Sequence, residues 1–233
     1  MSVEFGEIIE PSTRAFWDDY DESEDGAAPL LLYEWDWLNE DNTEQKIDNV
    51  KLLLILEGQA ISSFVGTAVL KGRSPICRLN NGSTSIYYNP DKATLICLSE
   101  EKDLNNFGRI TEKLVHWLGS AEQVAAISFQ PSVMHKGTSS RETEEACFIR
   151  AINGQVKTIP ELEAPNVIAG ISAGALSYRK FKDLEASAYV CYLDSSVLDS
   201  VSTKPILRLL NSLSVDCDLS YQLKFVDGSN LYV

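Results

Sequence analysis

The five residues from Gly170 to Gly174 form the sharpest chemical motif in the chain. Their sequence, Gly-Ile-Ser-Ala-Gly, matches the G-x-S-x-G turn that exposes a nucleophilic serine between a strand and a helix in serine hydrolases. The surrounding pattern fits, because residues 166–171 are predicted as a strand and residues 173–184 as a helix. Ser172 would then attack a carbonyl carbon, provided that an imidazole lies within reach to take its proton.

The positions of the histidines argue against this interpretation. Hydrolases with this motif place the serine first, then an acid, then the histidine, yet His116 and His135 both precede Ser172. A triad would therefore need a different chain order. Serine hydrolysis remains the alternative function, and the simpler interpretation is that the two glycines and Ala173 let a helix approach the sheet closely while Ser172 caps it.

Metal and nucleotide chemistry have little support in the sequence. Zinc sites draw on clustered cysteines and histidines, whereas the chain has no C-x-x-C pair and its two histidines are isolated. No G-x-x-x-x-G-K-[ST] phosphate loop is present, and no G-x-G-x-x-G opens a helix. An enzyme of phosphorylase-like α/β fold would need an anion site, and none is visible. We therefore expect no cofactor, no metal and no catalytic residue.

The charge of the chain is concentrated in its first 49 residues. The chain has 20 basic and 34 acidic residues and a net charge of -14, and 15 of the acidic but only 2 of the basic residues lie in this segment. Such a balance repels phosphate backbones and anionic membranes, so we expect neither nucleic acid nor a membrane as partner. The stretch from Asp18 to Asp25 is predicted to be solvated and flexible, and contact with a basic partner surface is the alternative.

The cysteines and the lack of long apolar runs indicate the compartment. No basic region followed by an apolar run opens the chain, and no stretch approaches the roughly 18 apolar residues of a membrane span. The cysteines are odd in number and widely spaced, which predicts reduced core thiols: Cys77, Cys97, Cys147, Cys191 and Cys217. We expect a soluble protein of the cytoplasm, with the nucleus as a second location.

From Val50 onward, the hydrophobic pattern predicts strands that alternate with helices. Residues 50–56 form a short apolar run typical of a strand buried on both faces, and a helix of small residues follows at 59–70. A hairpin is predicted where the segments 83–88 and 93–99 flank Asn89-Pro90-Asp91. Asp103 is predicted to cap a helix at 104–118. The remaining elements are strands at 124–129, 146–152 and 188–193 and a helix at 197–213.

This alternation predicts a single α/β domain with a mainly parallel sheet, flanking helices and an inserted hairpin. The acidic segment 1–49 precedes the domain at 50–227, and residues 228–233 are predicted to form a free tail because turn-forming residues precede the last three. Within the mixed run at residues 30–38 of the first segment, Tyr33, Trp35 and Trp37 alternate with the acidic Glu34 and Asp36. This pattern fits a half-buried edge strand or a segment that lies on a partner.

The last three residues of the sequence combine an apolar side chain, an aromatic ring and a carboxylate. Leu231 supplies an apolar contact, Tyr232 a rigid aromatic ring, and Val233 a terminal carboxylate that a lysine or a group of backbone N–H donors can bind. We predict that this tripeptide is a docking element for a larger protein assembly and that the protein is a non-catalytic binding protein.

Several segments, in their order and spacing, resemble the family of proteasome assembly chaperone 1. The resemblance is strongest in the first 25 residues and from Pro165 to the end, while residues 72–159 share only a similar layout of strands. The matching segments are Phe5-Gly6-Glu7, Pro11, Arg14-Ala15, Pro165-Asn166-Val167-Ile168, Ala175-Leu176-Ser177-Tyr178, Tyr189-Val190-Cys191-Tyr192, Leu198-Asp199, Lys204-Pro205-Ile206-Leu207 and Ser229-Asn230-Leu231-Tyr232-Val233.

The resemblance implies a role in proteasome assembly. A member of this family heterodimerises with proteasome assembly chaperone 2, binds proteasome α subunits, promotes assembly of the α-ring of the core particle and has no catalytic site. Its terminal hydrophobic-Tyr-any motif inserts between neighbouring α subunits. This role carries over to Leu231, Tyr232 and the carboxylate of Val233.

Overall fold

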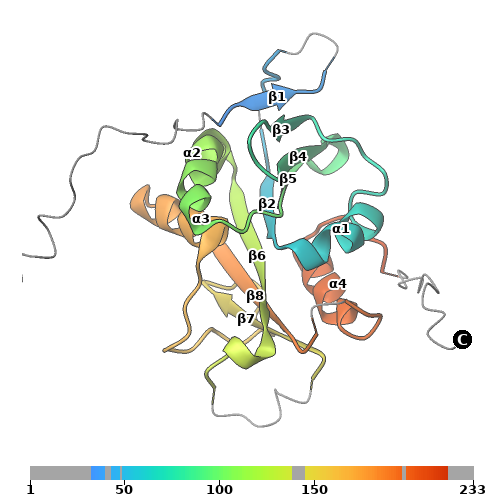
Figure 1. Cartoon of the computed structure of the whole chain (residues 1–233), viewed down its shortest axis with the longest axis vertical. Coiled ribbons are helices and arrows are strands. Elements are labelled where there is room, and N and C mark those ends of the chain that lie inside the picture. The colour runs from blue at the N-terminus through green and yellow to red at the C-terminus, as the bar shows by residue number, and fades with distance from the viewer. Residues whose placement is uncertain (1–32, 40–42, 48, 138–144, 196–197, 220–233) are drawn as a thin grey trace, which may run out of the picture. The chain divides into compact units, whose positions relative to one another are not determined.

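The scaffold of the protein, seen in a computed structural model, is an eight-stranded β-sheet. The structure describes residues 33–39, 43–47, 49–137, 145–195 and 198–219. The strands lie in the order β1-β3-β4-β5-β2-β6-β8-β7 across the sheet (Figure 1). Their bounds are β1 Trp35–Trp37, β2 Leu52–Glu57, β3 Cys77–Leu79, β4 Thr84–Asn89, β5 Thr94–Ser99, β6 Gln123–Pro131, β7 Cys147–Ile152 and β8 Ser187–Leu193.

The centre of the sheet is parallel and its two sides are antiparallel. Strands β5, β2, β6 and β8 run parallel to one another. On one side β4, β3 and β1 continue the sheet in antiparallel pairs, and on the other side β7 runs against β8. The connections between β3, β4 and β5 are too short for the crossover that parallel neighbours require. The predicted single α/β domain is confirmed, with a mixed sheet in place of a mainly parallel one.

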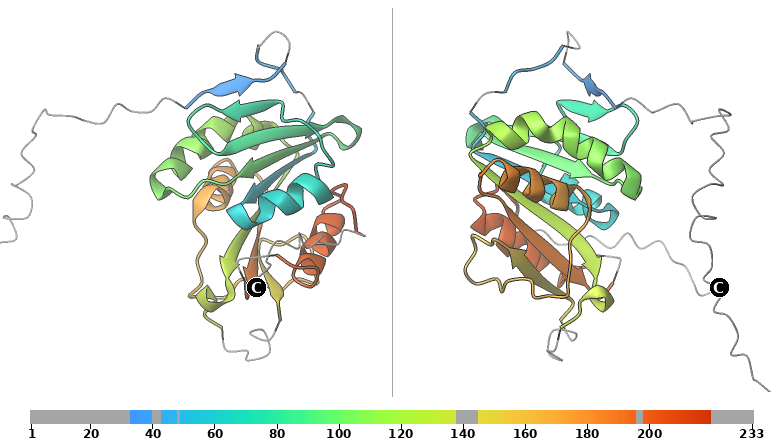
Figure 2. Two further views of the ribbon diagram at one scale, coloured as in Figure 1. Left: turned by 45° about the vertical axis from the view of Figure 1, so that its right-hand side comes forward. Right: turned by 90° about the vertical axis from the view of Figure 1, so that its left-hand side faces the viewer.

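Helices cover both faces of the sheet (Figures 1 and 2). Helices α1 (Ser62–Ala68) and α4 (Thr203–Ser212) pack with Leu54 and Leu56 of β2, while α2 (Leu104–Ser120) and α3 (Gly170–Phe181) pack with Leu53 and Ile55. Since successive side chains of a strand point to opposite faces, β2 is buried throughout, as its continuous apolar run predicts. No helix among the described residues is long and apolar enough to span a membrane.

Two local sequence signals predict their elements correctly. The Asp103 carboxylate accepts a hydrogen bond from the N–H of Asn105 at 2.9 Å, so it caps α2, and the apolar stripe of that helix is buried at Ile110, Leu114 and Leu118. The predicted hairpin is formed by β4 and β5 around a 3-10 turn at Pro90–Lys92. Two further 3-10 turns follow β2 and β6, at Gln59–Ile61 and Ser132–Met134.

Strand β1 closes one edge of the sheet through a cluster of tryptophans. The Trp35 and Trp37 rings lie edge-on to Trp117 of α2, with ring centroids 5.5 and 6.4 Å apart, and Trp35 Nε1 donates a 3.3 Å hydrogen bond to the Lys113 carbonyl. Asp36, between them, is exposed. The predicted edge strand is confirmed, and its pairing with β3 adds residues before position 50 to the sheet.

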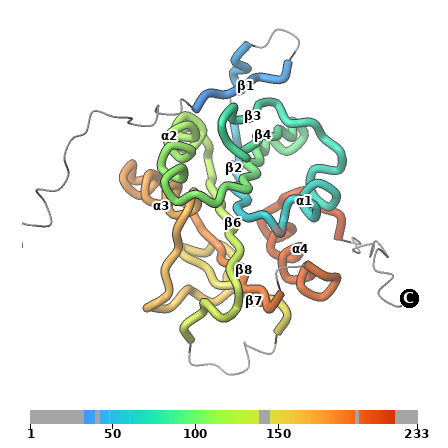
Figure 3. The backbone as a smooth tube through the Cα atoms, in the orientation of Figure 1, coloured from blue at the N-terminus to red at the C-terminus, as the bar shows by residue number. Residues whose placement is uncertain are grey.

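The strand predicted at residues 166–171 is wrong. The chain leaves β7 and runs as a loop until Gly170, where α3 begins (Figure 3). Gly170 has a φ of 82°, a backbone conformation that favours glycine and that no strand residue adopts. The start of α3 is fixed by a residue of β2, which lies more than a hundred positions earlier and is invisible to a local pattern.

Candidate functional site

A buried carboxylate holds the motif around Ser172. Glu57, the last residue of β2, is 9% exposed and accepts hydrogen bonds from the N–H of Ile171 (3.1 Å), the N–H of Ser172 (3.0 Å) and the hydroxyl of Ser172 (2.8 Å). The first N–H groups of a helix lack partners within it and carry partial positive charge, so an anionic acceptor stabilises α3 here. The prediction that Ser172 caps the helix is wrong, because Glu57 has that role.

The two glycines of the motif permit two close contacts. A Cβ atom at Gly170 would overlap the carboxylate of Glu57, and a Cβ atom at Gly174 would overlap the side chain of Thr111 on α2. The glycines thus bring the start of α3 close to β2 and its second turn close to α2. The predicted close approach exists, and it is made to the sheet at Gly170 and to a helix at Gly174.

The arrangement does not support a serine hydrolase. Ser172 is fully buried and its hydroxyl donates to a carboxylate, whereas a nucleophile elbow presents the hydroxyl to solvent and to an imidazole. His116 is exposed on α2. The ring of His135 packs edge-on against Phe148 and Tyr192, with centroid distances of 5.1 and 4.8 Å. The glycine motif therefore serves helix packing.

The predicted docking residues Leu231, Tyr232 and Val233 lie outside the described residues, as does the acidic stretch 18–25. The chain can be followed to Leu219, next to α1. Lys71 Nζ and Asp216 Oδ1 form an ion pair of 2.8 Å, and the N–H of Asp218 donates to the carbonyl of Ala68 at 2.8 Å. These contacts hold residues 216–218 against the end of α1 and the turn after it.

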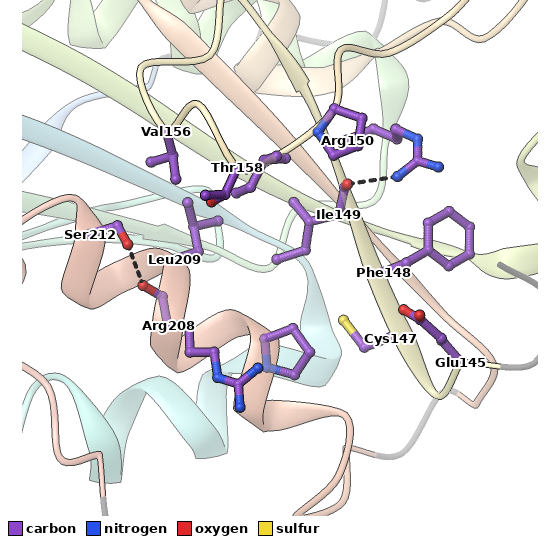
Figure 4. Close-up of a pocket in the computed structure, with 13 residues that line it drawn as sticks. Glu145, Cys147, Phe148, Ile149, Arg150, Val156, Thr158, Arg208, Leu209 and Ser212 are labelled. Carbon is purple, nitrogen blue, oxygen red and sulfur yellow. Dashed lines mark hydrogen bonds between the residues drawn. The ribbon is translucent and has the colours of Figure 1, made fainter.

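An open groove runs between the edge strand β7 and helix α4 (Figure 4). Its volume is about 420 Å³, and the segment 156–160 forms its third side. The lining residues are Glu145, Cys147, Phe148, Ile149 and Arg150 from β7 and its start, Val156, Thr158, Ile159 and Pro160 from the following segment, and Pro205, Arg208, Leu209 and Ser212 from α4. Aliphatic side chains of β7, the segment 156–160 and α4 thus meet in one place with Arg208, an arrangement suited to binding an apolar group with a negative charge beside it. The Arg150 guanidinium lies over Phe148, on the opposite face of the sheet.

Aromatic and thiol groups support the β7 side of this groove. The Phe148 and Tyr192 rings stack with centroids 5.0 Å apart, and the Arg150 guanidinium lies 5.3 Å from the centre of the Phe148 ring. Burial raises the pKa of Tyr192, while the charge of Arg150 opposes this shift. Burial also raises the pKa of Cys191, with a further contribution from the Cys147 thiol. These groups therefore stay protonated near neutral pH and serve packing.

Sequence reasoning missed this groove. One signal was available, since Arg150 interrupts an otherwise apolar strand candidate, and a buried arginine needs polar partners. Arg208 carried no such signal, because an arginine on a helix is usually a solvated surface residue. Only the fold brings Arg208 of α4 beside β7.

A second surface feature is a group of exposed apolar side chains on two loops. Val133 and Met134, after β6, are 86% and 61% exposed, and Val167, before α3, is 77% exposed. The side chain of Asn166 joins the loops, since it accepts a hydrogen bond from the N–H of Lys136 at 2.8 Å and donates one to its carbonyl at 3.2 Å. Exposed apolar groups of this kind occur at protein interfaces.

The described residues hold no group of three or more histidine, cysteine, aspartate or glutamate side chains that could bind a metal ion. All five cysteines are free thiols, and four of them are buried.

Known proteins share part of this sequence. The chain is 31% identical over 99 residues to proteasome assembly chaperone 1 of Mus musculus, a match that covers 41% of this chain and 34% of the mouse protein. It is 32% identical over 100 residues to proteasome assembly chaperone 1 of Xenopus laevis, covering 41% of this chain and 35% of that protein. The aligned part thus spans about a third of the length of these curated relatives. No family model matches the chain.

A solved structure of another protein has the same fold. PbaA of Pyrococcus furiosus, an archaeal homologue of proteasome-assembly chaperone, superposes with a TM-score of 0.57 over 81% of this chain and 84% of its own, at 10% identity. At this identity the likeness shows the shared fold alone. The sequence resemblance to proteasome assembly chaperone 1 is confirmed by the mouse and frog relatives.

Proposed function

We propose that this protein is a proteasome assembly chaperone that heterodimerises with a second chaperone, proteasome assembly chaperone 2. In this proposal the pair binds proteasome α subunits and promotes assembly of the α-ring of the core particle. The observation that carries the proposal is the 31% identity over 99 residues to proteasome assembly chaperone 1 of the mouse. Its sites of action are the cytoplasm and the nucleus.

The C-terminal tripeptide is the proposed docking element for the α-ring. Tyr232 supplies a rigid aromatic anchor with a polar tip, Leu231 an apolar contact and Val233 the carboxylate. Gly228, Ser229 and Asn230 precede them and give the backbone freedom to enter a pocket between two α subunits. Because the folded body would contact the ring separately, tail and body together bind with a raised effective concentration.

The described surfaces are compatible with binding and offer no catalytic centre in the place where the sequence suggested one. The serine of the glycine motif is sealed beneath Glu57, and the exposed features are the apolar residues Val133, Met134 and Val167 and the groove beside β7. A chaperone needs surfaces of this type, because it recognises partner proteins by shape and apolar contact.

Co-purification tests the proposal. The full chain, co-expressed with proteasome assembly chaperone 2 and α subunits, is expected to recover both, whereas a chain that lacks residues 231–233 keeps the second chaperone and loses most α-subunit recovery. Tyr232→Phe is the matched control, because it keeps the aromatic ring as an apolar anchor, and it is expected to keep α-subunit recovery. Failure of the full chain to recover either partner overturns the proposed function, and equal recovery without residues 231–233 overturns the docking role of the tail.

A further inference from the structure

Strand β7 ends the sheet, and its outer edge is only half covered. The N–H of Ala151 donates to the Pro160 carbonyl at 2.9 Å, and the Ala151 carbonyl accepts from the N–H of Leu162. The segment 160–162 thus lies parallel to β7 and pairs with it at this one position. Toward the start of β7, this added segment no longer reaches the edge.

The uncovered half of the edge presents backbone groups in the geometry of a strand. In an antiparallel pair, every second residue of a strand directs its backbone N–H and carbonyl away from the partner strand. Ala151 does so, and the backbone N–H and carbonyl groups of Cys147 and Ile149 therefore also face away from β8. The Ile149 carbonyl accepts a 3.0 Å hydrogen bond from Arg150 Nη1. Within the described part of the chain, the two N–H groups and the Cys147 carbonyl take no hydrogen-bond partner.

These backbone groups belong to residues that line the groove beside α4, and Figure 4 draws the lining residues. Four consecutive residues, Cys147 to Arg150, line it, which places the strand edge itself in the wall, since their side chains alternate between the two faces of the sheet. Leu209 and Pro205 of α4 line the groove as well, together with Ile159 of the segment 156–160. The groove therefore combines a row of strand hydrogen-bonding groups with pockets for alternate apolar side chains.

The charged residues that line the groove favour a bound segment with an acidic side chain. Arg208 is exposed on α4 at its rim, and the one ion pair found among the described residues joins Lys71 and Asp216, elsewhere on the surface. Arg208 thus offers its guanidinium to a carboxylate, with which it can form two parallel hydrogen bonds. Glu145 also lines the groove and repels an acidic side chain placed beside it, which favours placement of the negative charge at Arg208.

We propose that this groove binds an extended acidic peptide segment of a partner protein, which adds a strand to β7 at Cys147–Ile149. The segment hydrogen-bonds to the outward backbone groups, places an aliphatic side chain against Leu209 and Ile159 and directs a carboxylate to Arg208. Addition of a strand to an exposed sheet edge is a common mode of peptide recognition, in which backbone bonds give affinity and side-chain pockets give selectivity. The inference rests on this geometry and holds independently of the proposed function.

A labelled peptide of alternating valine and glutamate, titrated into the full chain and followed by fluorescence anisotropy, tests the proposal. Saturable binding is expected. Substitution of glutamine for the glutamates removes the contact with Arg208, and N-methylation of alternate peptide amides removes strand hydrogen bonds, so each change is expected to weaken binding on the order of tenfold. In a separate measurement, amide hydrogen exchange at Cys147 and Ile149 is expected to slow when the peptide is bound.

Two variants of α4 locate the binding. Arg208→Glu is expected to weaken binding on the order of tenfold, whereas Lys204→Glu, on the same helix but outside the groove lining, is expected to leave it within about twofold. Both residues are exposed, so both variants should fold. Absence of saturable binding overturns the proposal, as does equal binding of the N-methylated peptide or equal loss in both variants. Concentration-dependent dimerisation that Arg208→Glu abolishes, without peptide binding, assigns the groove to a second copy of this chain and also overturns it.

Discussion

The carboxylate of Glu57, at the end of β2, accepts a 2.8 Å hydrogen bond from the hydroxyl of Ser172 in the first turn of α3. This contact joins the centre of the parallel sheet to the start of a helix 115 positions later in the chain. The G-x-S-x-G motif at Gly170–Gly174 therefore forms a capped helix start and does not present a nucleophile. The same contact accounts for Gly170, because any side chain at that position would displace the carboxylate.

The variant Ser172→Ala tests whether the hydroxyl of Ser172 can act as a nucleophile. Because Ser172 is buried and its hydroxyl donates a hydrogen bond to Glu57, the wild-type chain is expected to show no covalent labelling by a fluorophosphonate probe. The variant is expected to recover α subunits as the wild type does. Gel fluorescence beside an active serine hydrolase provides the measurement and its positive control. If the probe labels the wild type but not Ser172→Ala, Ser172 is a nucleophile and the serine hydrolase interpretation is correct.

Glu57→Gln is expected to lower the free energy of unfolding by about 1–3 kcal/mol, since the amide keeps one acceptor but loses the charge that favours the N-terminus of α3. Urea unfolding measures this change. Glu112→Gln, on the exposed face of α2, is the matched control and should stay within about 0.5 kcal/mol of wild type. Equal midpoints for the two variants would show that the cap contributes nothing.

Elements with a local cause could be predicted from the sequence. Asp103 caps α2 through its own neighbour Asn105, the turn at Pro90–Lys92 reverses the chain between β4 and β5, and the apolar run of β2 is buried on both faces. In each case the residues that determine the structure lie within a few positions of one another.

Contacts between distant segments could not be predicted in this way. Arg179 reads as an ordinary basic residue in the last turn of a helix, yet it is 2% exposed and its guanidinium donates to the carbonyls of Leu118, Ala121, Glu122 and Glu185 at 2.7–3.1 Å. Three of those carbonyls, of Leu118, Ala121 and Glu122, surround the end of α2, about sixty residues away, and that of Glu185 follows α3. The groove beside β7 has the same origin, since Arg208 meets Ile149 only after the sheet has formed.

Gly174→Ala should weaken the contact between α3 and α2. The new methyl group would overlap the Thr111 side chain, and overpacking of this kind costs about 1–3 kcal/mol, more than the gain in helix propensity. Gly108→Ala is the control, because no atom lies within 4 Å of its Cβ position and the higher helix propensity should stabilise the protein by about 0.5–1 kcal/mol. Thermal unfolding of both variants provides the measurement.

A second substitution distinguishes overlap from any other effect of Gly174→Ala. Thr111→Ala removes the two atoms nearest to the new methyl group, Oγ1 and Cγ2. The double variant is therefore expected to recover part of the stability that Gly174→Ala loses. Strict additivity of the two single changes would exclude a steric cause, because residues in contact show coupling in such a cycle.

Acid should destabilise the turn that leads into α4. The Asp199 carboxylate accepts hydrogen bonds from the N–H groups of Ser202 (2.7 Å) and Val201 (2.9 Å), and these bonds, that of Ser202 first, hold the pKa of Asp199 below its ordinary value of 3.8. A carboxyl whose pKa is lower in the folded state adds stability above its unfolded pKa, and this stability is lost as the pH falls through its folded pKa.

Asp199→Asn is accordingly expected to unfold more easily at pH 7 and to lose less stability than the wild type between pH 5 and pH 3, where an unfolded aspartate takes up its proton. Urea unfolding at a series of pH values measures both effects. Asp194→Asn, an exposed aspartate just after β8, is the control and should follow the wild-type profile. Parallel profiles for wild type and Asp199→Asn would show that the turn around Asp199 does not couple folding to protonation.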